Sequence, residues 1–399
     1  MPKEYSPFTP GVPVPIEFFV GRVAEVDRLK TAAKESTSGR LRVSFLTGER
    51  GIGKSSLAFF VRVLAEREHQ VVGLHTFLGG VTSLEEMVRR VFDRLLKESI
   101  GKTWEGKVRD FFGNHIRQVG LFGVSVELGT PDRDLGRMVH DFVPAVRRLV
   151  DRLRDERKGL FLILDDINGL AVSAPFANWL KSIVDEIATS DEPLPLCLIL
   201  VGLEDRRQAL IDRQPSLARV FDIVDIRPWT QEEGTTFFQT AFSKVNVKIA
   251  DAALSMLVRY SGGLPVLAHE IGDAVYRTDQ DGTIDYDDAV VGILSAAEIV
   301  GRKYIEPRIF EAIRSERYRA ILRKIVTQRF DIRFKRGDLR KDLTSDEAKV
   351  LDNFLRRMKG LGVVKTDPEG GPGAYRFDNL LHYLYISLAS SRAQKAPGT

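Results

Sequence analysis

The sequence has little cysteine and no long apolar run, and these absences limit what the protein can be. A single cysteine, Cys197, stands in 399 residues, so no disulfide can form within the chain. It lies in the apolar run of residues 194–201, which is typical of a buried strand. No apolar run reaches the roughly 18 residues that a membrane span needs, and the first residues lack the apolar segment of a signal peptide. We therefore expect a cytoplasmic protein that does not enter a membrane.

The chain is rich in apolar and charged residues, which make up 43% and 29% of it. A chain of this length is too long for one ordinary domain, so two or three are expected. The charge is uneven, because residues 301–399 hold 22 lysines and arginines against 12 aspartates and glutamates, although the whole chain carries only +4. A basic C-terminal region is compatible with nucleic-acid binding, but a solvated basic surface is the commoner explanation of one charge cluster.

The most informative segment is residues 48–55, which fits the P-loop pattern G-x-x-x-x-G-K-[ST]. A strand-like apolar run precedes it and an unbroken helical pattern follows, as the motif requires. Its glycines let successive backbone N–H groups point at phosphate oxygens. Lys54 is expected to contact the β- and γ-phosphates, and the Ser55 hydroxyl to bind Mg²⁺. The residues expected to bind ATP or ADP are Glu49, Arg50, Gly51, Ile52, Gly53, Lys54, Ser55 and Ser56.

Two carboxylates follow the apolar run of residues 160–164, which predicts a central strand buried on both faces. In a P-loop protein the first of them, Asp165, would hold Mg²⁺ directly or through a water, and the second, Asp166, would polarise the attacking water. The alternative is a strand-end turn, which a sequence such as Asp-Asp-Ile-Asn commonly makes.

The order of patterns predicts an α/β fold, a P-loop NTPase with a five-stranded parallel sheet, followed by a helical lid and a winged helix-turn-helix. Residues 100–135 predict a helix and a hairpin inserted into the sheet region, and residues 136–157 predict a helix kinked at Pro144. The expected parts are an ATPase domain with a proline-rich N-terminal arm at 1–228, a helical lid at 229–300, a winged-helix domain at 301–392 and a disordered tail at 393–399.

The winged helix is predicted from helices near residues 317–326 and 345–359 and from a hairpin at residues 363–377. Such a domain binds double-stranded DNA in some proteins and serves as a protein-docking or autoinhibitory module in others. If it binds DNA, the candidate contacts are Lys349, Arg356, Arg357, Lys365 and Arg376.

Five segments, taken in this order and spacing, resemble the AAA+ and STAND ATPases of the Orc/Cdc6-like and archaeal-ATPase groups. They are residues 19–22 with Glu25, residues 48–55, residues 160–166, Arg219 and residues 262–265. The resemblance covers roughly residues 5–390. It implies that Val20, Gly21 and Arg22 lie against the adenine, that Pro265 closes the other side of the nucleotide, and that His269 contacts a phosphate.

The chain also departs from the AAA+ pattern in three places. The polar residue that this pattern has after the fourth strand is matched only by Glu204 or Asp205. Asp165 and Asp166 are the STAND form of a motif that is usually Asp-Glu in AAA+ enzymes, and the shorter second carboxylate implies slow hydrolysis. A lid arginine expected in AAA+ proteins is replaced by Gly-Leu-Pro, which leaves Arg219 as the candidate arginine finger. The alternative for Arg219 is a structural ion pair with Asp222 or Glu204.

Two functions fit these patterns. The first is an ATP-driven switch whose nucleotide state sets lid position and self-assembly, with a winged helix that binds DNA. The second is a STAND-type regulator whose winged helix packs on the ATPase domain or on a protein partner. A P-loop small-molecule kinase is disfavoured, because a helical lid and a winged helix follow the sheet region with no evident substrate-binding insertion.

Overall fold

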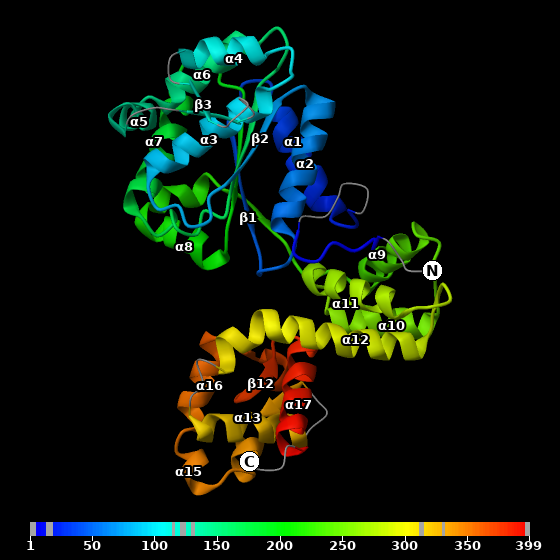
Figure 1. Ribbon diagram of the computed structural model, residues 1–399. Helices are drawn as coiled ribbons and strands as arrows, with labels where there is room; N and C mark the ends of the chain where they lie inside the picture. The colour runs from blue at the N-terminus through cyan, green and yellow to red at the C-terminus, as the bar shows by residue number, and fades with distance from the viewer. Residues whose placement is uncertain are drawn as a thin grey trace. The chain divides into compact units, whose positions relative to one another are not determined.

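The computed structural model describes residues 5–12, 19–113, 116–119, 125–128, 132–310, 315–328 and 332–395 (Figure 1). The chain divides into two compact units. Pro15–Arg227 forms the first, which we call the sheet unit, and Met1–Val14 with Pro228–Thr399 forms the second, which we call the helical unit. None of the described helices is long and apolar enough to cross a membrane.

The sheet unit is built on a five-stranded parallel sheet in the order β2-β5-β6-β1-β7. Every residue of β5 and β6 is buried, which explains why their sequences are continuous apolar runs rather than alternating ones. The predicted five-stranded parallel sheet is therefore confirmed. The strands are β1 (Arg42–Thr47), β2 (Val72–Phe77), β5 (Leu160–Asp165), β6 (Leu196–Val201) and β7 (Asp222–Asp225).

Helices cover both faces of this sheet. Figure 1 shows α1 and α2 on one face and α3, α7 and α8 on the other. The larger core lies under the second group, where leucine, valine and phenylalanine side chains of the helices meet those of β2, β5 and β6. The helices are α1 (Val23–Ser36), α2 (Lys54–His69), α3 (Leu84–Ser99), α7 (Ala174–Ala188) and α8 (Glu204–Arg213).

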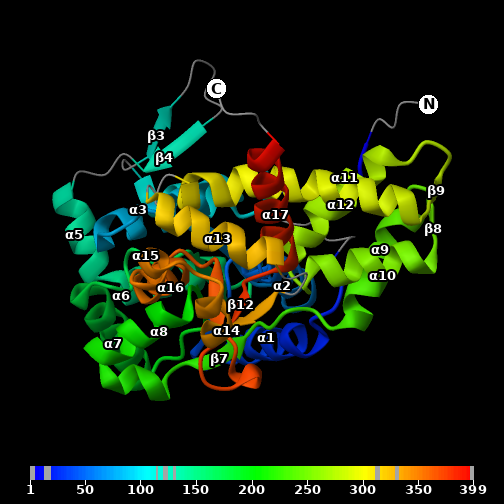
Figure 2. The same ribbon diagram turned by 90° about the horizontal axis from the view of Figure 1, so that it is seen from below.

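The insertion between β2 and β5 contains the predicted helix and hairpin. These are α4 (Glu105–Phe112) and the antiparallel pair β3 (Ile116–Val119) and β4 (Ser125–Leu128), which Figure 2 shows near α3. The predicted kink at Pro144 is wrong. The chain breaks instead at Asp141, between α5 (Asp132–His140) and α6 (Phe142–Leu153). Pro144 lies in the first turn of α6, where its missing N–H has no intrahelical acceptor to lose.

The helical unit begins with four helices: α9 (Gln231–Ser243), α10 (Asp251–Ser261), α11 (Pro265–Thr278) and α12 (Tyr286–Val300). Thr230 and Glu233 form a capping box at the start of α9, with both reciprocal hydrogen bonds present. A parallel pair of two-residue strands, β8 (Lys248–Ile249) and β9 (Thr283–Ile284), was not predicted. Strands this short leave no period in the sequence.

The C-terminal part of the helical unit has four α-helices between residues 316 and 360, followed by the predicted hairpin, and the structure adds a third strand to that hairpin. β10 (Arg333–Lys335) pairs with β12 (Ala374–Phe377), which pairs with β11 (Val364–Thr366), all antiparallel. The helix predicted at residues 345–359 is two helices, because the chain leaves helical geometry at Val350 (φ −105°, ψ −1°). The remaining elements are η4 (Gly301–Phe310), α13 (Glu316–Gln328), α14 (Arg336–Lys341), α15 (Ser345–Ala348), α16 (Leu351–Gly360), η5 (Pro368–Gly370) and α17 (Leu380–Lys395).

The predicted boundary at residue 300 falls inside one compact unit. The π-helix η4 continues directly from α12, and α17 packs so closely that a side chain at Gly301 would overlap the Tyr385 ring. The division into a lid and a winged-helix domain therefore stays a prediction. At the other end, α17 extends three residues into the tail predicted to be disordered, and residues 396–399 lie outside the described residues.

The described part of the N-terminal arm, residues 5–12, belongs to the helical unit, whereas the sequence placed it in the ATPase domain. Phe8 is only 3% exposed. Its ring meets Phe237 and Phe242 edge to face, with centroids 5.8 and 5.0 Å apart. A side chain at Gly272 would overlap the Phe8 ring, so this glycine makes room for the arm on α11. Burial of one aromatic ring fixes the arm on the helical unit.

Candidate functional site

The loop between β1 and α2 has the backbone conformation that the P-loop pattern requires. Its glycines all have positive φ: 143° at Gly48, 75° at Gly51 and 94° at Gly53. At Gly48 a Cβ would also lie 2.6 Å from the carbonyl oxygen of Ile226, just beyond the end of β7. No other residue fits there without moving the edge of the sheet. The glycines predicted to shape a phosphate-binding loop therefore do shape a tight loop here.

The loop ends at the start of α2, where Gly53 is the N-cap and no side chain caps the helix. Uncapped N–H groups at a helix start are hydrogen-bond donors for an anion. Ile52 is buried and anchors the loop, Glu49, Arg50 and Gly51 are exposed, and Ser55 and Ser56 lie in the first turn of α2.

Lys54 folds back over the loop. Its Nζ donates to the carbonyl oxygens of Gly48 at 2.9 Å and Glu49 at 2.8 Å. Burial lowers the pKa of Lys54, and the nearby Asp165 carboxylate opposes that shift. The structure thus brings the predicted phosphate-binding lysine close to the predicted metal-binding carboxylate, although 110 residues of sequence separate them.

Asp165, the last residue of β5, is 2% exposed, and its carboxylate has a partner that the sequence did not suggest. The Nε2 atom of His75 on β2 lies 2.7 Å from Asp165 Oδ2. No sequence signal marks His75, because the contact depends on the pairing of β2 with β5 and on which face of the sheet each residue occupies.

Asp166 follows in the left-handed region, with φ 57°, and it is exposed. Asn168 donates from Nδ2 to the Asp166 carboxylate, and its Oδ1 accepts from the Leu203 amide at 3.2 Å. A Cβ at Gly79 would lie 3.0 Å from Asp166 Oδ2, so this glycine gives the carboxylate room. A strand-end turn does form here, and it holds the Asp166 carboxylate exposed next to Asp165.

The segment predicted to contact adenine lies beside the P-loop. Gly21 and Arg22 both have positive φ (73° and 61°), and Arg22 Nη2 donates to the Ile52 carbonyl at 3.4 Å. Phe19 stacks on Phe60 of α2 with centroids 4.3 Å apart. These contacts place Val20, between them in sequence, near the same loop, and its contact with adenine stays a prediction.

Arg219 ends the 3₁₀-helix η3 (Pro215–Arg219) and is exposed. The two carboxylates considered as its structural partners are paired with other arginines. Arg28 Nε donates to Asp222 at 3.2 Å, and Arg207 Nε donates to Glu204 at 2.9 Å. Within the described part of the chain, the Arg219 guanidinium has no ion pair, so the structural-pair alternative finds no support.

Pro265 and His269 both lie on α11. Gly262 and Gly263 have φ of 57° and 73°, and the Trp229 amide donates to the Gly263 carbonyl at 2.8 Å, which fixes the turn that precedes Pro265. His269 is 3% exposed, and its Nδ1 accepts from the Thr9 amide at 3.0 Å. His269 therefore holds the N-terminal arm in this structure. Its contact with a phosphate and that of Pro265 with the nucleotide stay predictions.

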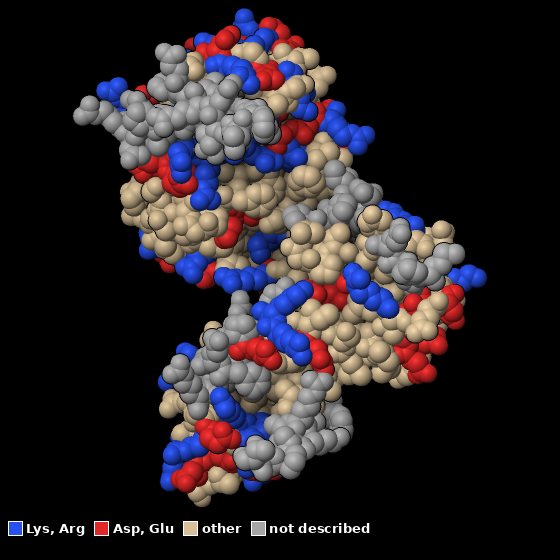
Figure 3. Space-filling model, in the orientation of Figure 1, with Lys and Arg blue, Asp and Glu red and all other residues tan. Residues whose placement is uncertain are grey.

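The five basic residues proposed for DNA contact are spread over α16, the hairpin and the end of α15. Lys349 pairs with Asp346 at 2.9 Å and Lys365 with Asp378 at 2.7 Å, so acidic partners offset part of their charge. Figure 3 likewise shows acidic side chains beside basic ones over the C-terminal part of the chain. Arg356 and Arg357 are exposed on α16, and Arg376 is half-buried on β12.

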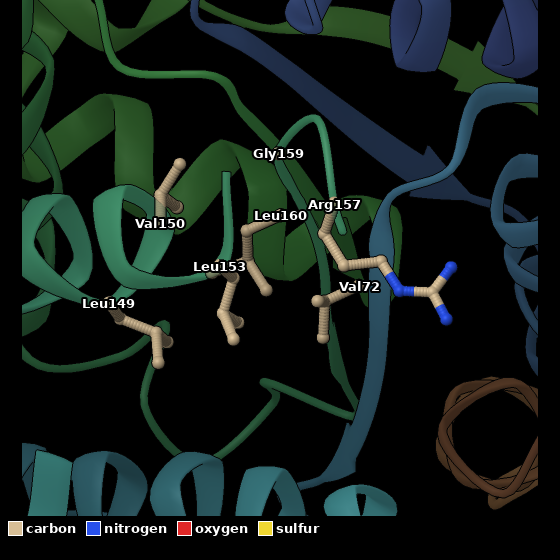
Figure 4. Close-up of a pocket in the computed structure, with 7 residues that line it drawn as sticks. All are labelled: Val72, Leu149, Val150, Leu153, Arg157, Gly159 and Leu160. Carbon is tan, nitrogen blue, oxygen red and sulfur yellow. The ribbon is translucent and has the colours of Figure 1, made fainter. Parts of the chain in front are cut away.

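A small apolar pocket lies at the opposite edge of the sheet from the P-loop (Figure 4). Val72 and Leu160, the first residues of β2 and β5, line it together with apolar side chains of α6, and the Arg157 guanidinium points away from them. Ligands of parallel sheets bind at the carboxyl ends of the strands, and this pocket lacks polar groups to orient a ligand. We assign it no function.

Comparison with known proteins agrees with this geometry. The sequence of residues 19–199 matches the AAA ATPase domain family. The match begins at the Phe19 segment and ends within β6, so it takes in the P-loop and both carboxylates. No curated protein matches the chain as a relative.

Solved structures extend the likeness in fold to nearly the whole chain. The ORC2 protein of Aeropyrum pernix, in complexes with ADPNP and ADP, is 15% identical with a TM-score of 0.58 over 99% of this chain and 98% of that one. A Walker-type ATPase of Pyrococcus abyssi is 16% identical with a TM-score of 0.54 over 92% of this chain and 96% of that one. At these identities the likeness shows a shared Orc/Cdc6-like fold.

We expect the buried His269 to make the helical unit sensitive to acid. Burial lowers its pKa to about 4, below its ordinary value near 6.5, so the unfolded chain binds the extra proton first as the pH falls. The contribution of neutral His269 to the free energy of unfolding is therefore complete above pH 6.5. It decreases as the pH falls toward 4, by up to about 1.4 kcal/mol per pH unit. The exchange rate of the Thr9 amide in the wild type, corrected for intrinsic chemistry, should rise as the pH falls over this range. In His269→Gln the exchange rate, corrected for intrinsic chemistry, should be flat, and an equal pH response in both proteins would contradict this assignment.

Proposed function

We propose that this protein is an ATP-binding switch that hydrolyses ATP slowly, and that its nucleotide state controls assembly and DNA binding. The proposal rests on one observation above all. The uncapped start of α2, the half-buried Lys54 and the buried Asp165 meet at the carboxyl edge of a parallel sheet. Backbone N–H groups and one lysine suit the phosphates of ATP, and a carboxylate and a hydroxyl supply the oxygen ligands that Mg²⁺ prefers.

Mg²⁺ fits this site only together with a nucleotide. Within the described residues, no group of three or more His, Cys, Asp or Glu side chains could hold a metal ion. Ser55 and Asp165 would therefore hold Mg²⁺ with phosphate oxygens and waters completing its shell, as this ion usually requires. The bound ion would neutralise charge on the phosphates. Asp166, held exposed by its turn, would orient the attacking water, and its short side chain is consistent with slow turnover.

The roles of Lys54 and Asp166 predict opposite effects of substitution. Lys54→Ala should weaken ATP binding by at least about tenfold, because one hydrogen bond to a charged group contributes about 1.5–3 kcal/mol. Asp166→Asn should bind ATP nearly as the wild type does and hydrolyse it more slowly. Titration calorimetry and single-turnover hydrolysis measure the two effects, with Lys34→Ala on the exposed face of α1 as a control. Equal loss of binding in Asp166→Asn would show that its role is wrongly assigned.

Arg219 suits an arginine finger, because it is exposed and its two candidate acidic partners bind other arginines. A finger acts on a neighbouring copy of the chain and contributes roughly 10³-fold or more to rate. We expect Arg219→Ala to lower ATP turnover in assembled protein without changing ATP affinity. Arg213→Ala, an exposed arginine at the end of α8, is the matched control. If Arg219→Ala only lowers the melting temperature, the residue is structural.

DNA binding is the second part of the proposal, with the helices and the three-stranded sheet of residues 316–377 acting as a winged helix. Arg333, Arg376 and Lys365 are direct cross-strand neighbours on β10, β12 and β11, which gathers three cations in one row of the sheet. Arg333 was not among the predicted contacts, because its strand was not predicted. The acidic partners of Lys349 and Lys365 favour the alternative, a STAND-type regulator whose winged helix docks on protein.

Salt dependence separates these alternatives. If three to five phosphates are contacted, the affinity of the full chain for a DNA duplex should fall with a log–log slope of about −3 to −4.5. Substituting Gln for Arg356 and Arg357 together should flatten the slope by up to about 1.8, since each contact contributes about −0.9. As a control, substituting Gln for the exposed Lys34 and Arg40 together should leave the salt-dependence slope unchanged. A folded chain that binds no duplex at low salt would favour the protein-docking alternative.

A further inference from the structure

His75 lies beside the candidate metal-binding carboxylate and has no role in the proposal so far. It is 2% exposed in the middle of β2, and its ring stacks on Phe77 with centroids 4.4 Å apart. The register of β2 and β5 pairs Phe77 with Asp165, so His75, two residues earlier, shares a face of the sheet with that carboxylate. Nε2 then reaches Asp165 Oδ2 at 2.7 Å.

The surroundings of the ring fix its tautomer. His75 Nδ1 is buried and has no hydrogen-bond partner among the described residues. A proton on Nδ1 would leave a buried donor unsatisfied and would set two acceptors, Nε2 and the carboxylate, against each other. The proton therefore lies on Nε2, and His75 donates to Asp165.

This hydrogen bond constrains a carboxylate that has a strong competing attraction nearby. The Lys54 ammonium and the Asp165 carboxylate attract each other electrostatically. Without a hydrogen bond that fixes its orientation, the carboxylate could turn toward the lysine. With Oδ2 bound to His75, the other carboxylate oxygen would be left for a metal ion or its water. Hydrogen bonds to metal-ligating groups of this kind typically change metal affinity 10–100-fold when removed.

We propose that His75 is a positioning residue that holds the Asp165 carboxylate for Mg²⁺ in the nucleotide complex. The inference rests on the proposed ATP site. It assigns His75 a role in Mg²⁺-dependent tightening of nucleotide binding and none in the binding of nucleotide without metal. It also accounts for a buried imidazole with an unpaired nitrogen at the carboxyl half of β2, which packing alone would fill better with an apolar residue.

Three substitutions at His75 separate positioning from packing. His75→Gln keeps an N–H donor at nearly the reach of Nε2, His75→Asn keeps polarity but is too short to reach Asp165, and His75→Leu keeps volume and removes the donor. The measurement is the dissociation constant of a fluorescent ATP analogue in excess Mg²⁺ and in EDTA, supported by Mn²⁺ binding followed by electron paramagnetic resonance. Thermal unfolding confirms that each variant is folded.

In the wild type, Mg²⁺ should lower the dissociation constant of the ATP analogue. In the Leu and Asn variants we expect this Mg²⁺ effect to be about 10–100-fold smaller, with the dissociation constant in EDTA unchanged. The Gln variant should keep most of the Mg²⁺ effect. If Leu does not fold, the contrast between Gln and Asn decides. Equal tightening in the wild type and in the Asn and Leu variants would overturn the role of His75 and leave the proposed function standing. A wild type that binds no nucleotide, or binds it equally well in Mg²⁺ and EDTA, would overturn the proposed Mg²⁺–ATP site and this inference with it.

Discussion

The candidate site depends on hydrogen bonds that continue the parallel ladder one step beyond the strands. The loops that follow β2, β5, β6 and β7 are each tied to a neighbouring strand by a backbone amide near their start, and two of these bonds are accepted by β1, the strand before the P-loop. Because these bonds set where each loop departs, the P-loop, Asp165 and the Asp166 turn are held at one level. The bonds run from Leu78 N–H to Asp165, Ile167 N–H to Val201, Gly202 N–H to Leu46 and Ile226 N–H to Thr47, at 2.7–3.1 Å.

Sequence patterns predicted this edge well, because its main features are local. Glycine at positions that need positive φ, an apolar run buried on both faces and a carboxylate at its end are all visible without knowing which strands pair. The His75 contact was not predicted, since it depends on the pairing and register of β2 and β5, which no short pattern encodes. The break at Asp141 was missed because Pro144 is the stronger local signal, yet a proline is tolerated in a first turn.

In the helical unit the missed features are long-range. Phe8 and Thr9 meet α9 and α11 across more than 200 residues of sequence, and the proline-rich arm gave no sign of where it would pack. Its contact with His269 ties a residue predicted for nucleotide binding to the N-terminus. The third strand, β10, was not predicted, because it has only three residues and lies in a basic stretch of sequence. The alignment of Arg333 with the cations of β12 and β11 was therefore missed as well.

The chain thus joins a sheet unit, in which residues 19–199 match the AAA ATPase domain family, to a helical unit. The response of this helical unit to nucleotide is the central claim. Size-exclusion chromatography with light scattering tests it most directly, with the protein in ADP or in a non-hydrolysable ATP analogue, with and without duplex DNA. We expect nucleotide to elute with the protein in both states, and the molar mass or the retained DNA to differ between them. Protein that elutes without nucleotide, or with the same mass and the same DNA content in both states, would contradict the account.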